Sequence, residues 1–352
     1  MAEDSFRQYM RNEESSGKPM PELRVIASNG QRIEKEPAVS PNTPPSPDPN
    51  MVWVSGGTFQ MGSNNHYPEE APVHSATVTG FWMDKYPITN RQFAAFVEAT
   101  QHVTLAERPA NPEDYPGAKP EMLAPSSVVF VKPPGPVDLR NHYNWWKYIP
   151  GADWRHPEGP ATSIEHRLDH PVVHIAYADA EEYARWAGKA LPTEAEWEFA
   201  ARGGLDGATY AWGEELAPNG NYLANTWQGE FPWQNLRQDG YERTAPAGQF
   251  PANPYGLFDM IGNVWEWTTD WYTNGHPPKT CCGSSSAGGR EQSFDPAMPD
   301  IRIPRRVIKG GSFLCAPNYC RRYRPAARMA QPVDTAACHV GFRLITRPSG
   351  SA

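Results

Sequence analysis

The alternation of hydrophobic and polar positions predicts several short strands and a few short helices. From Met51, the run MVWVSGGTFQMGS alternates apolar with small residues around a glycine turn, which is typical of a hairpin. Residues 76–89, ATVTGFWMDKYPIT, favour another strand. That strand leads to Thr89, which stands three residues before Gln92 and completes a capping box ahead of an apolar helical face.

Two further helices follow in the middle of the chain. One is indicated at Asp179, with an acidic residue three positions on, and it runs to Gly188. The other opens at the capping box of Thr193 and closes at the glycine pair 203–204. After that pair come short strands and turns dense in Trp and Gly, with no further long helix and no internal repeat. A few helices beside many short strands in one unit indicate an α+β fold.

Composition adds loops and aromatic packing to this picture. The chain has 352 residues, enough for one large domain or two ordinary ones, and 39% of them are hydrophobic and 20% charged. Its 38 prolines are well above the usual ~5% of residues. Together with 29 glycines and 13 tryptophans, they indicate a loop-rich fold packed around aromatic rings.

The proline-rich segments also set the predicted boundaries. Residues 1–50 are polar and end in a proline-rich run, so we expect a disordered tail there. One domain over 51–347 and a short tail over 348–352 complete the chain. Within the domain, residues 104–150 are rich in proline and form a long surface excursion. A connection of that length in a compact domain usually has a function, and we interpret it as the wall of a substrate groove.

Charge and cysteine usage exclude several classes of protein. The net charge of −8 argues against a nucleic-acid binder. The sequence has no run of about 18 apolar residues, so no membrane span is predicted. The N-terminus lacks the apolar core of a signal peptide, and we therefore expect a cytoplasmic protein. The cysteines number five, an odd count, and all follow residue 280, which does not fit a scattered disulfide framework.

Candidate chemistry concentrates in GGSFLCAPNYCRRYRPAAR, residues 310–328. Its glycines and proline predict a loop, in which four residues separate Cys315 from Cys320. Four arginines follow, and guanidinium charge near a thiol lowers the pKa of that thiol. Two thiolates that converge on one point suit a soft ion, Cu(I) above all. The spacing alone also allows a disulfide or two inert buried thiols.

Other metal patterns are weaker. His166, His170 and His174 are spaced as possible ligands, but Asp169 and Pro171 flank His170 and position 172 is a valine rather than the carboxylate of a non-haem iron set. Packing histidines are therefore the preferred interpretation. The adjacent pair Cys281–Cys282 could join the two loop cysteines in a zinc site. Two further stretches, 225–241 and 259–267, carry carboxamides and carboxylates beside glycines. Such loops can hold calcium, although solvated turns are favoured by chemistry alone.

Taken in order, the segments of this chain resemble the formylglycine-generating enzymes, the sulfatase-modifying factors that convert a sulfatase cysteine to the catalytic aldehyde. The resemblance covers nearly all of residues 51–347 and implies a single domain, related to C-type lectins and poor in regular secondary structure. The matching segments are MVWVSGGTFQMGS, GFWMDKYPITNRQF, GADWRHPEGP, RLDHPVVHIAYADAEEYARWAGKALPTEAEWEFAARGG, NTWQGEFPW, YGLFDMIGNVWEWTTDWY, KGGSFLCAPNYCRRYRPAAR and HVGFR.

The resemblance implies a copper-dependent oxidase. Cys315 and Cys320 would bind Cu(I), a cysteine of an unfolded sulfatase would join them as a third thiolate, and O2 activated there would oxidise it to formylglycine. The substrate signal would be Cys-x-Pro-x-Arg, whose arginine needs a carboxylate partner. The residues expected to line the pocket are Ser312, Tyr319, Trp265 and His339, the last in place of an asparagine of the animal members. The carboxylates considered for the substrate arginine are Glu107, Glu113 and Asp114.

With the resemblance, calcium sites become the favoured hypothesis for the two polar loops. One site would use the side chains of Asn225 and Asp239 with the carbonyls of Thr226 and Tyr241. The other would use the side chains of Asp259 and Glu266 with the carbonyls of Gly262 and Val264.

The animal members have two disulfides that this chain lacks. Ala201 and Pro325 stand in place of one cysteine pair, and Ala184 and Leu344 in place of the other, as expected for a reducing compartment. Cys338 is a third thiol near the site, more readily read as a bystander than as a competitor for copper. We expect a monomer.

The rival hypotheses are a non-catalytic binding module on the same lectin-like scaffold and a non-haem iron enzyme of the same superfamily. The retained thiol pair argues against the first, and the missing histidine–carboxylate set argues against the second.

Overall fold

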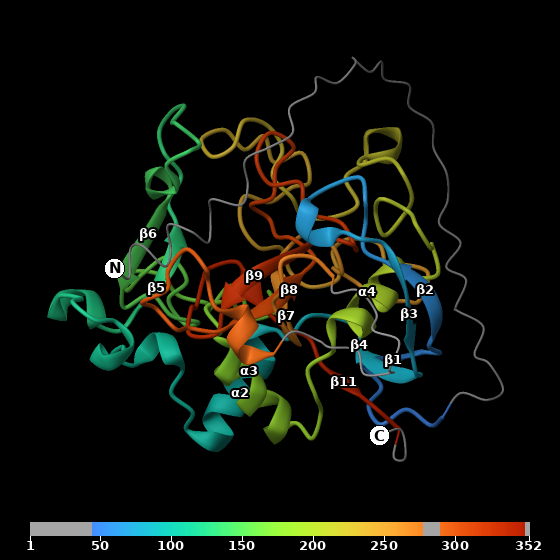
Figure 1. Ribbon diagram of the computed structural model, residues 1–352, viewed down its shortest axis with the longest axis horizontal. Coiled ribbons are helices and arrows are strands. Elements are labelled where there is room, and N and C mark those ends of the chain that lie inside the picture. Colours follow the sequence, from blue (N-terminus) through green and yellow to red (C-terminus); the bar gives the residue numbers. More distant parts are fainter. Residues whose placement is uncertain (1–43, 277–288, 349–352) are drawn as a thin grey trace.

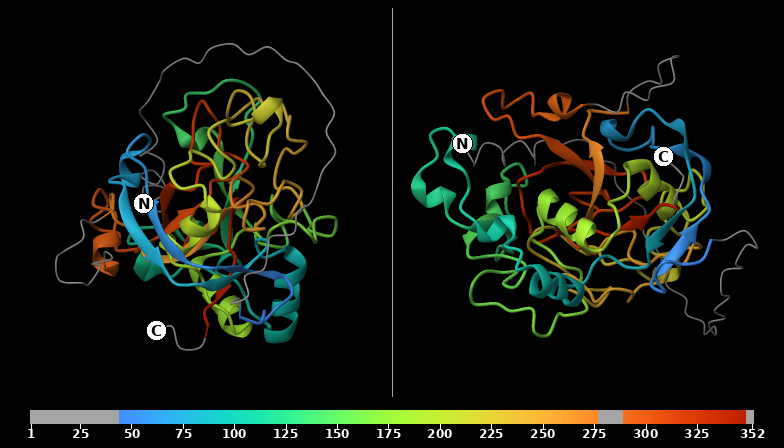
Figure 2. Two further views of the ribbon diagram at one scale, coloured as in Figure 1. Left: turned by 90° about the vertical axis from the view of Figure 1, so that its right-hand side faces the viewer. Right: turned by 90° about the horizontal axis from the view of Figure 1, so that it is seen from below.

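Short sheets joined by long loops make up this computed structural model, which describes residues 44–276 and 289–348 (Figures 1 and 2). Apart from single 3-10 turns, the helices in these ranges are α2 (Asn90–Thr100), α3 (Tyr177–Trp186) and α4 (Glu194–Arg202). The strands are β1 (Met51–Val54), β2 (Gly57–Met61), β3 (His74–Val78), β4 (Phe81–Asp84), β5 (Ser126–Phe130), β6 (Trp146–Pro150), β7 (Trp265–Trp271), β8 (Arg305–Lys309), β9 (Arg328–Pro332), β10 (Val340–Gly341) and β11 (Ile345–Thr346). The predicted α+β class with little regular structure is confirmed.

Two of the helices begin where the sequence predicts. The Thr89 hydroxyl accepts a hydrogen bond from the Gln92 amide at the start of α2, and Thr193 plays the same role for α4. Helix α4 ends at Gly203, whose φ of +58° fits a left-handed cap. Helix α3 begins earlier than predicted, because Asp179 is its third residue rather than its cap and accepts from the Ala176 amide at 3.1 Å.

The expected hairpin at residues 51–63 is wrong. Strand β1 pairs antiparallel with β4, while β2 pairs antiparallel with β3, so the two segments belong to different sheets. Gly56 makes this change of sheet, with φ +74°, and a Cβ there would lie 2.6 Å from the Val78 carbonyl oxygen. The single strand expected over 76–89 is likewise divided into β3 and β4.

The excursion at residues 104–150 carries more structure than a plain loop. It contains short 3-10 turns, and β5 and β6 pair within it as an antiparallel hairpin from Ser126↔Pro150 to Phe130↔Trp146. The green β5–β6 pair lies to one side of the central strands in Figure 1.

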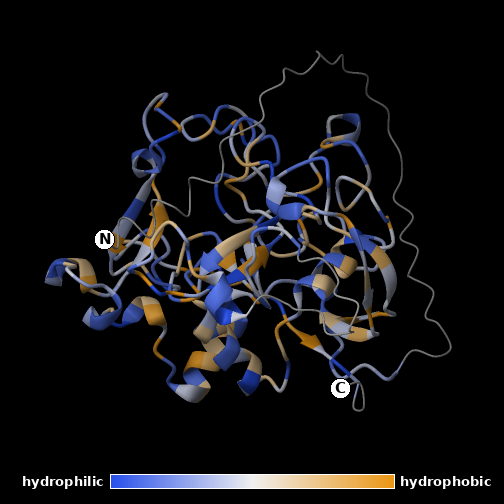
Figure 3. Cartoon of the chain, in the orientation of Figure 1, coloured by the Kyte–Doolittle hydropathy of each residue, from blue (hydrophilic) through white to orange (hydrophobic). Residues whose placement is uncertain are grey.

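The central sheet has the strand order β10-β7-β8-β9, and α4 packs against β7 and β8. Trp265 and Trp267 of β7 are almost fully buried there, as the aromatic packing expected from composition requires. Hydrophobic colour marks β11 in Figure 3, whereas many of the outer loops are hydrophilic. Strands β8 and β9 are antiparallel neighbours, with Lys309 opposite Arg328, and the chain between them is the cysteine-bearing segment. No helix of the described ranges is long and apolar enough to cross a membrane.

Candidate dithiol site

The cysteine-bearing segment, residues 310–327, is the irregular connection between β8 and β9, hereafter the thiol loop. It opens with two glycines of positive φ, and Gly311 at φ +73° lies so close to Tyr323 that a Cβ would be 2.9 Å from the Tyr323 backbone. The predicted loop is therefore confirmed. The glycine turn places the next residues, Ser312 to Ala316, in the interior of the protein.

The loop brings Cys315 and Cys320 together. Their Sγ atoms lie 3.2 Å apart, both residues are buried, and both are thiols rather than a disulfide. The Ser312 amide points to the Cys315 sulfur at 3.4 Å. Two soft sulfur donors at one point suit Cu(I), so the residues present fit the predicted ion. Among residues 44–276 and 289–348, no group of three or more His, Cys, Asp or Glu side chains is arranged to hold a metal.

An aromatic wall stands beside the thiols. Tyr319 stacks on Phe231 with ring centroids 4.5 Å apart and contacts Trp145 edge to face at 5.4 Å. Trp227 packs on Phe231 at 5.3 Å, and its amide donates to the Cys315 carbonyl at 3.0 Å. The sequence analysis predicted Tyr319 but not the other three rings, because Trp145 and the pair Trp227 and Phe231 come from two distant segments that only the fold brings together.

Trp265 and His339 meet on the edge of the central sheet. The Trp265 amide donates to the His339 carbonyl at 2.8 Å where β10 pairs with β7. The His339 ring lies 4.9 Å from that of Trp146. Burial, together with nearby His174, lowers the pKa of His339 to about 3, so the imidazole is neutral. Its Nδ1 has no hydrogen-bond partner within the described part of the chain, which leaves a buried polar atom for a ligand or water.

Tyr323 is a site residue that the sequence did not single out. It is fully buried, and burial raises the pKa of its phenol, with nearby Tyr210, Cys315 and Cys320 acting in the same direction. Its hydroxyl has no hydrogen-bond partner among the residues described. In the sequence, only the position of Tyr323 three residues after Cys320 indicates that it belongs to the site. That position does not determine whether the ring lies near the thiols.

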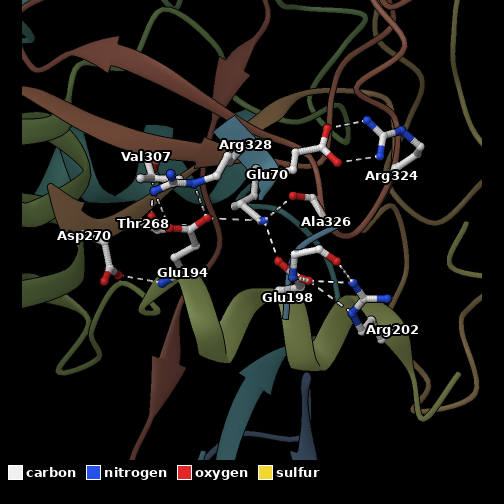
Figure 4. Close-up of polar contacts among 12 residues, drawn as sticks. Glu70, Glu194, Glu198, Arg202, Thr268, Asp270, Val307, Arg324, Ala326 and Arg328 are labelled. Atoms are coloured by element: carbon white, nitrogen blue, oxygen red, sulfur yellow. Dashed lines mark hydrogen bonds and ion pairs between the residues drawn. The ribbon is translucent and has the colours of Figure 1, made fainter. Parts of the chain in front are cut away.

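Three of the four arginines after Cys320 are buried in ion pairs, contrary to the open charge expected, whereas Arg321 is exposed. Arg322 pairs with Glu69 at 2.6 Å. Arg324 pairs with Glu70, and Arg328 pairs with Glu194 at 2.7 Å (Figure 4); all six side chains are buried. Each guanidinium charge is balanced by a carboxylate from another segment, so its effect on a thiol is largely cancelled.

The other sulfur and nitrogen candidates have packing roles. The Cys338 sulfur accepts from the Phe130 amide at 3.2 Å, and burial raises the pKa of this thiol to about 11, which favours the bystander reading. Both ring nitrogens of His174 are used, by the Ser127 hydroxyl and the Pro157 carbonyl. His170 bonds the Thr244 hydroxyl. Cys281 and Cys282 lie outside the described residues.

The first predicted calcium loop is held by hydrogen bonds of its own. The Asp239 carboxylate accepts from the amides of Thr226 and Tyr241, both at 3.0 Å, and from the Gln228 side chain at 2.8 Å. Burial raises the pKa of Asp239. A carboxylate offers about four acceptor positions, so one position remains for a cation.

The second loop fits a cation at one end better than at the other. Burial raises the pKa of Asp259 to about 6, and its carboxylate accepts from the Gly248 amide at 2.6 Å. Glu266, by contrast, is gripped by Arg343 through two bonds of 2.7 and 2.8 Å and by the Trp197 indole at 2.7 Å. A calcium ion there would share these oxygens with a guanidinium, so Glu266 suits the ion less well than Asp259 does. The carbonyls of Gly262 and Val264 lie on the intervening turn.

A cavity of about 710 Å³ borders Trp146, and none of the predicted dithiol-site residues is part of its lining. Its lining includes Trp146, which contacts His339, and much of the 104–150 excursion, together with residues of β9 and the segment before β8. Of the three carboxylates expected to receive an arginine, Asp114 lines the cavity. Glu107 does not, and it is committed to Arg155 at 2.6 Å.

Fold and site define a single α+β domain that holds a buried dithiol beside an aromatic pocket. Residues 36–348 match the family model described as the sulfatase-modifying factor enzyme 1-like domain. The chain therefore belongs to this family, as its motifs predicted.

Individual relatives agree with this assignment. The chain is 52% identical to the formylglycine-generating enzyme of Mycobacterium tuberculosis, over 85% of this chain and 98% of the relative. It is 41% identical to the mouse formylglycine-generating enzyme, over 89% and 80%. A cattle relative named inactive C-alpha-formylglycine-generating enzyme 2 is 36% identical over 86% and 90%. Among solved structures, PvdO from Pseudomonas aeruginosa has the same fold, with a TM-score of 0.56 and 21% identity over 84% and 94%.

Proposed function

We propose that this protein oxidises a cysteine of a sulfatase to formylglycine, using Cu(I) and O2. The observation that carries the proposal is the pair of buried thiols, Cys315 and Cys320, with sulfur atoms 3.2 Å apart. Relatives at 52% and 41% identity bear the name of that activity. A relative named inactive also lies in the family, so family membership alone does not decide activity, and the thiol pair is the feature that favours an enzyme.

The chain's own residues would prepare a dry, neutral pocket for this reaction. Bound at the thiols, Cu(I) would supply a soft ion for the substrate sulfur and a one-electron donor to O2. The two cysteines are buried, and the Tyr319–Phe231–Trp145 wall would help to keep water from their sulfur atoms. Neutral His339, with its unused Nδ1, can hydrogen-bond the substrate or an oxygen species, and the Ser312 amide orients the Cys315 sulfur. Trp265 fixes the His339 backbone.

The electron count of the reaction requires a second reductant. Converting CH2SH to CHO with release of hydrogen sulfide removes two electrons from the substrate, whereas reducing O2 to water consumes four. Two molecules of an external thiol, oxidised to one disulfide, supply the remaining two electrons and two protons. The overall products are then the aldehyde, hydrogen sulfide, one disulfide and one water.

The cavity beside Trp146 is the proposed seat of an extended Cys-x-Pro-x-Arg segment. It has room for several side chains, is lined by the excursion predicted as a groove wall, and borders Trp146, whose ring contacts that of His339. Asp114, an exposed carboxylate on its lining, is the proposed partner of the substrate arginine. An extended segment must be unfolded to enter such a cavity, so the substrate is proposed to be a sulfatase before it folds.

We further propose calcium in the 225–241 and 259–267 loops, a reducing cytoplasmic setting, and a monomer. Buried Asp259 with its raised pKa supports a cation. Three buried cysteines that remain thiols support a reducing compartment. Both loops hydrogen-bond the Cys315 side of the thiol loop, Trp227 to the Cys315 carbonyl and Asn263 to the Phe313 amide, so bound calcium would steady the dithiol site.

The test uses a whole sulfatase produced without activation. It is denatured, diluted into Cu(I)-loaded protein with a thiol reductant in air, and digested, and the mass of its Cys-x-Pro-x-Arg peptide is measured. We expect conversion of the cysteine to the aldehyde in the unfolded sulfatase and much less in the folded one. Unchanged cysteine in both, with copper still bound, would reject the proposed substrate.

A further inference from the structure

The two thiols are held by different parts of the molecule. On the Cys315 side, the Trp227 amide bonds the Cys315 carbonyl at 3.0 Å, and the Phe313 amide bonds the Asn263 carbonyl at 3.0 Å. These contacts tie Cys315 to the 225–263 region. The separation of the two sulfur atoms therefore depends on what holds Cys320.

Cys320 is followed by residues bound to the tip of the β2–β3 connection, residues 67–70, hereafter the hairpin tip. The Tyr67 hydroxyl accepts from the Arg321 amide at 3.0 Å. Arg322 lies 3.8 Å over the Tyr67 ring and donates to Glu69 at 2.6 Å. The hairpin tip thus contacts each of the two residues that come directly after Cys320.

Arg324 completes the attachment through a two-pronged ion pair. It donates to Glu70 from both terminal nitrogens, one at 2.7 Å, and its Nε donates to the Arg321 carbonyl at 2.8 Å (Figure 4). Glu70 and Arg324 are both almost fully buried. A bidentate guanidinium–carboxylate pair fixes direction as well as distance, and a buried one is costly to break.

The base of the thiol loop is fixed by a further set of contacts, in which the side chains of Glu69 and Glu70 take no part. Lys309 and Arg328 face each other across β8 and β9, and Glu194 of α4 lies within reach of both, at 3.5 and 2.7 Å. Arg328 also donates to the backbone carbonyl of Glu69 at 3.2 Å, and changes of the glutamate side chains leave that contact in place. Loss of the tip contacts would consequently free Cys320 locally without opening the sheet.

We propose that the hairpin tip is a positioning device for the dithiol, with Glu69 and Glu70 setting the approach of the Cys320 sulfur to the Cys315 sulfur. Tyr67 assists through its hydroxyl. None of these residues touches substrate in this scheme; they act through Arg321, Arg322 and Arg324. The inference concerns the thiol geometry, which can be measured without copper or substrate, and so stands or falls independently of the sulfatase activity.

The test is the thiol–disulfide equilibrium of the pair with glutathione, in a background of Cys281→Ser and Cys282→Ser. Oxidised glutathione and the two thiols give the Cys315–Cys320 disulfide and two reduced glutathione molecules, and alkylation with mass analysis counts each form. The equilibrium constant reports the effective concentration of one thiol near the other. A general loss of stability would not by itself change that ratio in folded protein.

We expect Glu70→Gln and Glu69→Gln each to lower this equilibrium constant by about tenfold, because Cys320 is no longer held against Cys315. Tyr67→Phe removes one hydrogen bond and no charge, so it should fold even if the glutamate variants do not, with a decrease of about threefold. The matched control is Glu196→Gln, which breaks a bidentate pair with Arg347 away from the thiol loop and should leave the constant unchanged. Constants within twofold of the parent in every folded variant, Tyr67→Phe included, would overturn the proposal, as would an equal decrease in Glu196→Gln.

Discussion

At the scale of single residues, Cys315 and Cys320 carry the proposed chemistry, and the residues around them explain why these two thiols differ from the third. Cys338 is also buried, but its sulfur already accepts the Phe130 amide, and burial raises the pKa of that thiol to about 11. A thiol held in the protonated form is a poor metal ligand. The pair, by contrast, offers two sulfur atoms at one point.

This difference predicts the copper affinity of single cysteine variants. Cys315→Ser and Cys320→Ser should each lower the Cu(I) affinity by at least about 100-fold, because one soft ligand remains. Titration against a chromogenic Cu(I) chelator without oxygen measures the affinity. Cys338→Ser keeps an acceptor for the Phe130 amide and should bind copper as the parent does. Loss of copper in that control would place the ion elsewhere.

A second residue-scale prediction concerns Asp114 and the substrate arginine. Asp114→Asn should raise KM for a Cys-x-Pro-x-Arg peptide by about fivefold, since an exposed ion pair contributes up to ~1 kcal/mol. Steady-state kinetics measure the change. Glu113→Gln is the matched control, because Glu113 precedes Asp114 in the sequence and does not line the cavity. A peptide with Ala in place of Arg should erase the difference between parent and variant; a difference that persists would contradict the assignment.

At the scale of elements, local sequence signals identified the helices better than the strand pairings. A capping box is complete within four residues, so Thr89 and Thr193 predict the starts of α2 and α4 without tertiary information. The pairing of β1 with β4 rather than β2 depends on a glycine turn that redirects the chain into another sheet. Alternation of apolar residues shows that a strand exists and does not name its neighbour.

The same limit applies to the site. The order of the motifs predicted the thiol pair, with Tyr319, Trp265 and His339 as its neighbours. The roles of these residues stay predictions. The arginine partners could not be predicted, because Arg322 and Arg324 pair with glutamates roughly 250 positions away in the sequence. An isolated arginine run looks like open charge until the fold supplies its counter-ions.

The two polar loops predict a calcium dependence. A chelator such as EGTA should lower the melting temperature, by an amount equivalent to about 3 kcal/mol if calcium is near 100 times its Kd, because the ion binds the folded chain alone. Calorimetry with and without calcium measures this. Asp239→Asn should shrink the shift, whereas Asp138→Asn, an exposed turn aspartate, should keep it. An identical melting temperature with and without the ion would show that calcium does not stabilise the folded protein.

At the scale of the whole molecule, buried charge makes stability depend on pH. Figure 4 shows Glu194 beside Arg328, Glu198 beside Arg202, and the Asp270 carboxylate accepting from the Glu194 amide. Burial alone would raise the pKa of Glu194, but Arg328 and Lys309 bring it to about 2. Asp270 behaves in the opposite way, because burial and the nearby Glu194 charge raise its pKa to about 6.

The raised pKa of Asp270 predicts a stability loss on going from acid to neutral pH. A carboxyl whose pKa is higher folded than unfolded stabilises the protein below its unfolded value, near 3.8, and loses that contribution as pH rises through about 6. Relative to Asp270→Asn, the parent should therefore lose about 3 kcal/mol of unfolding free energy between about pH 4 and pH 7. Urea unfolding across this range measures it. Parallel curves for parent and variant would show that folding does not raise the pKa of Asp270.

The most direct test of the whole account is the mass of a short Cys-x-Pro-x-Arg peptide after aerobic incubation with Cu(I)-loaded protein and a thiol reductant. We predict the mass loss that accompanies replacement of CH2SH by CHO, with hydrogen sulfide released, and no such loss with Cys320→Ser. A peptide that keeps its cysteine, incubated with protein that holds Cu(I) tightly, would contradict the proposed substrate. If the protein also fails to bind Cu(I), the dithiol is not a copper centre, and a binding module on this fold becomes the better description.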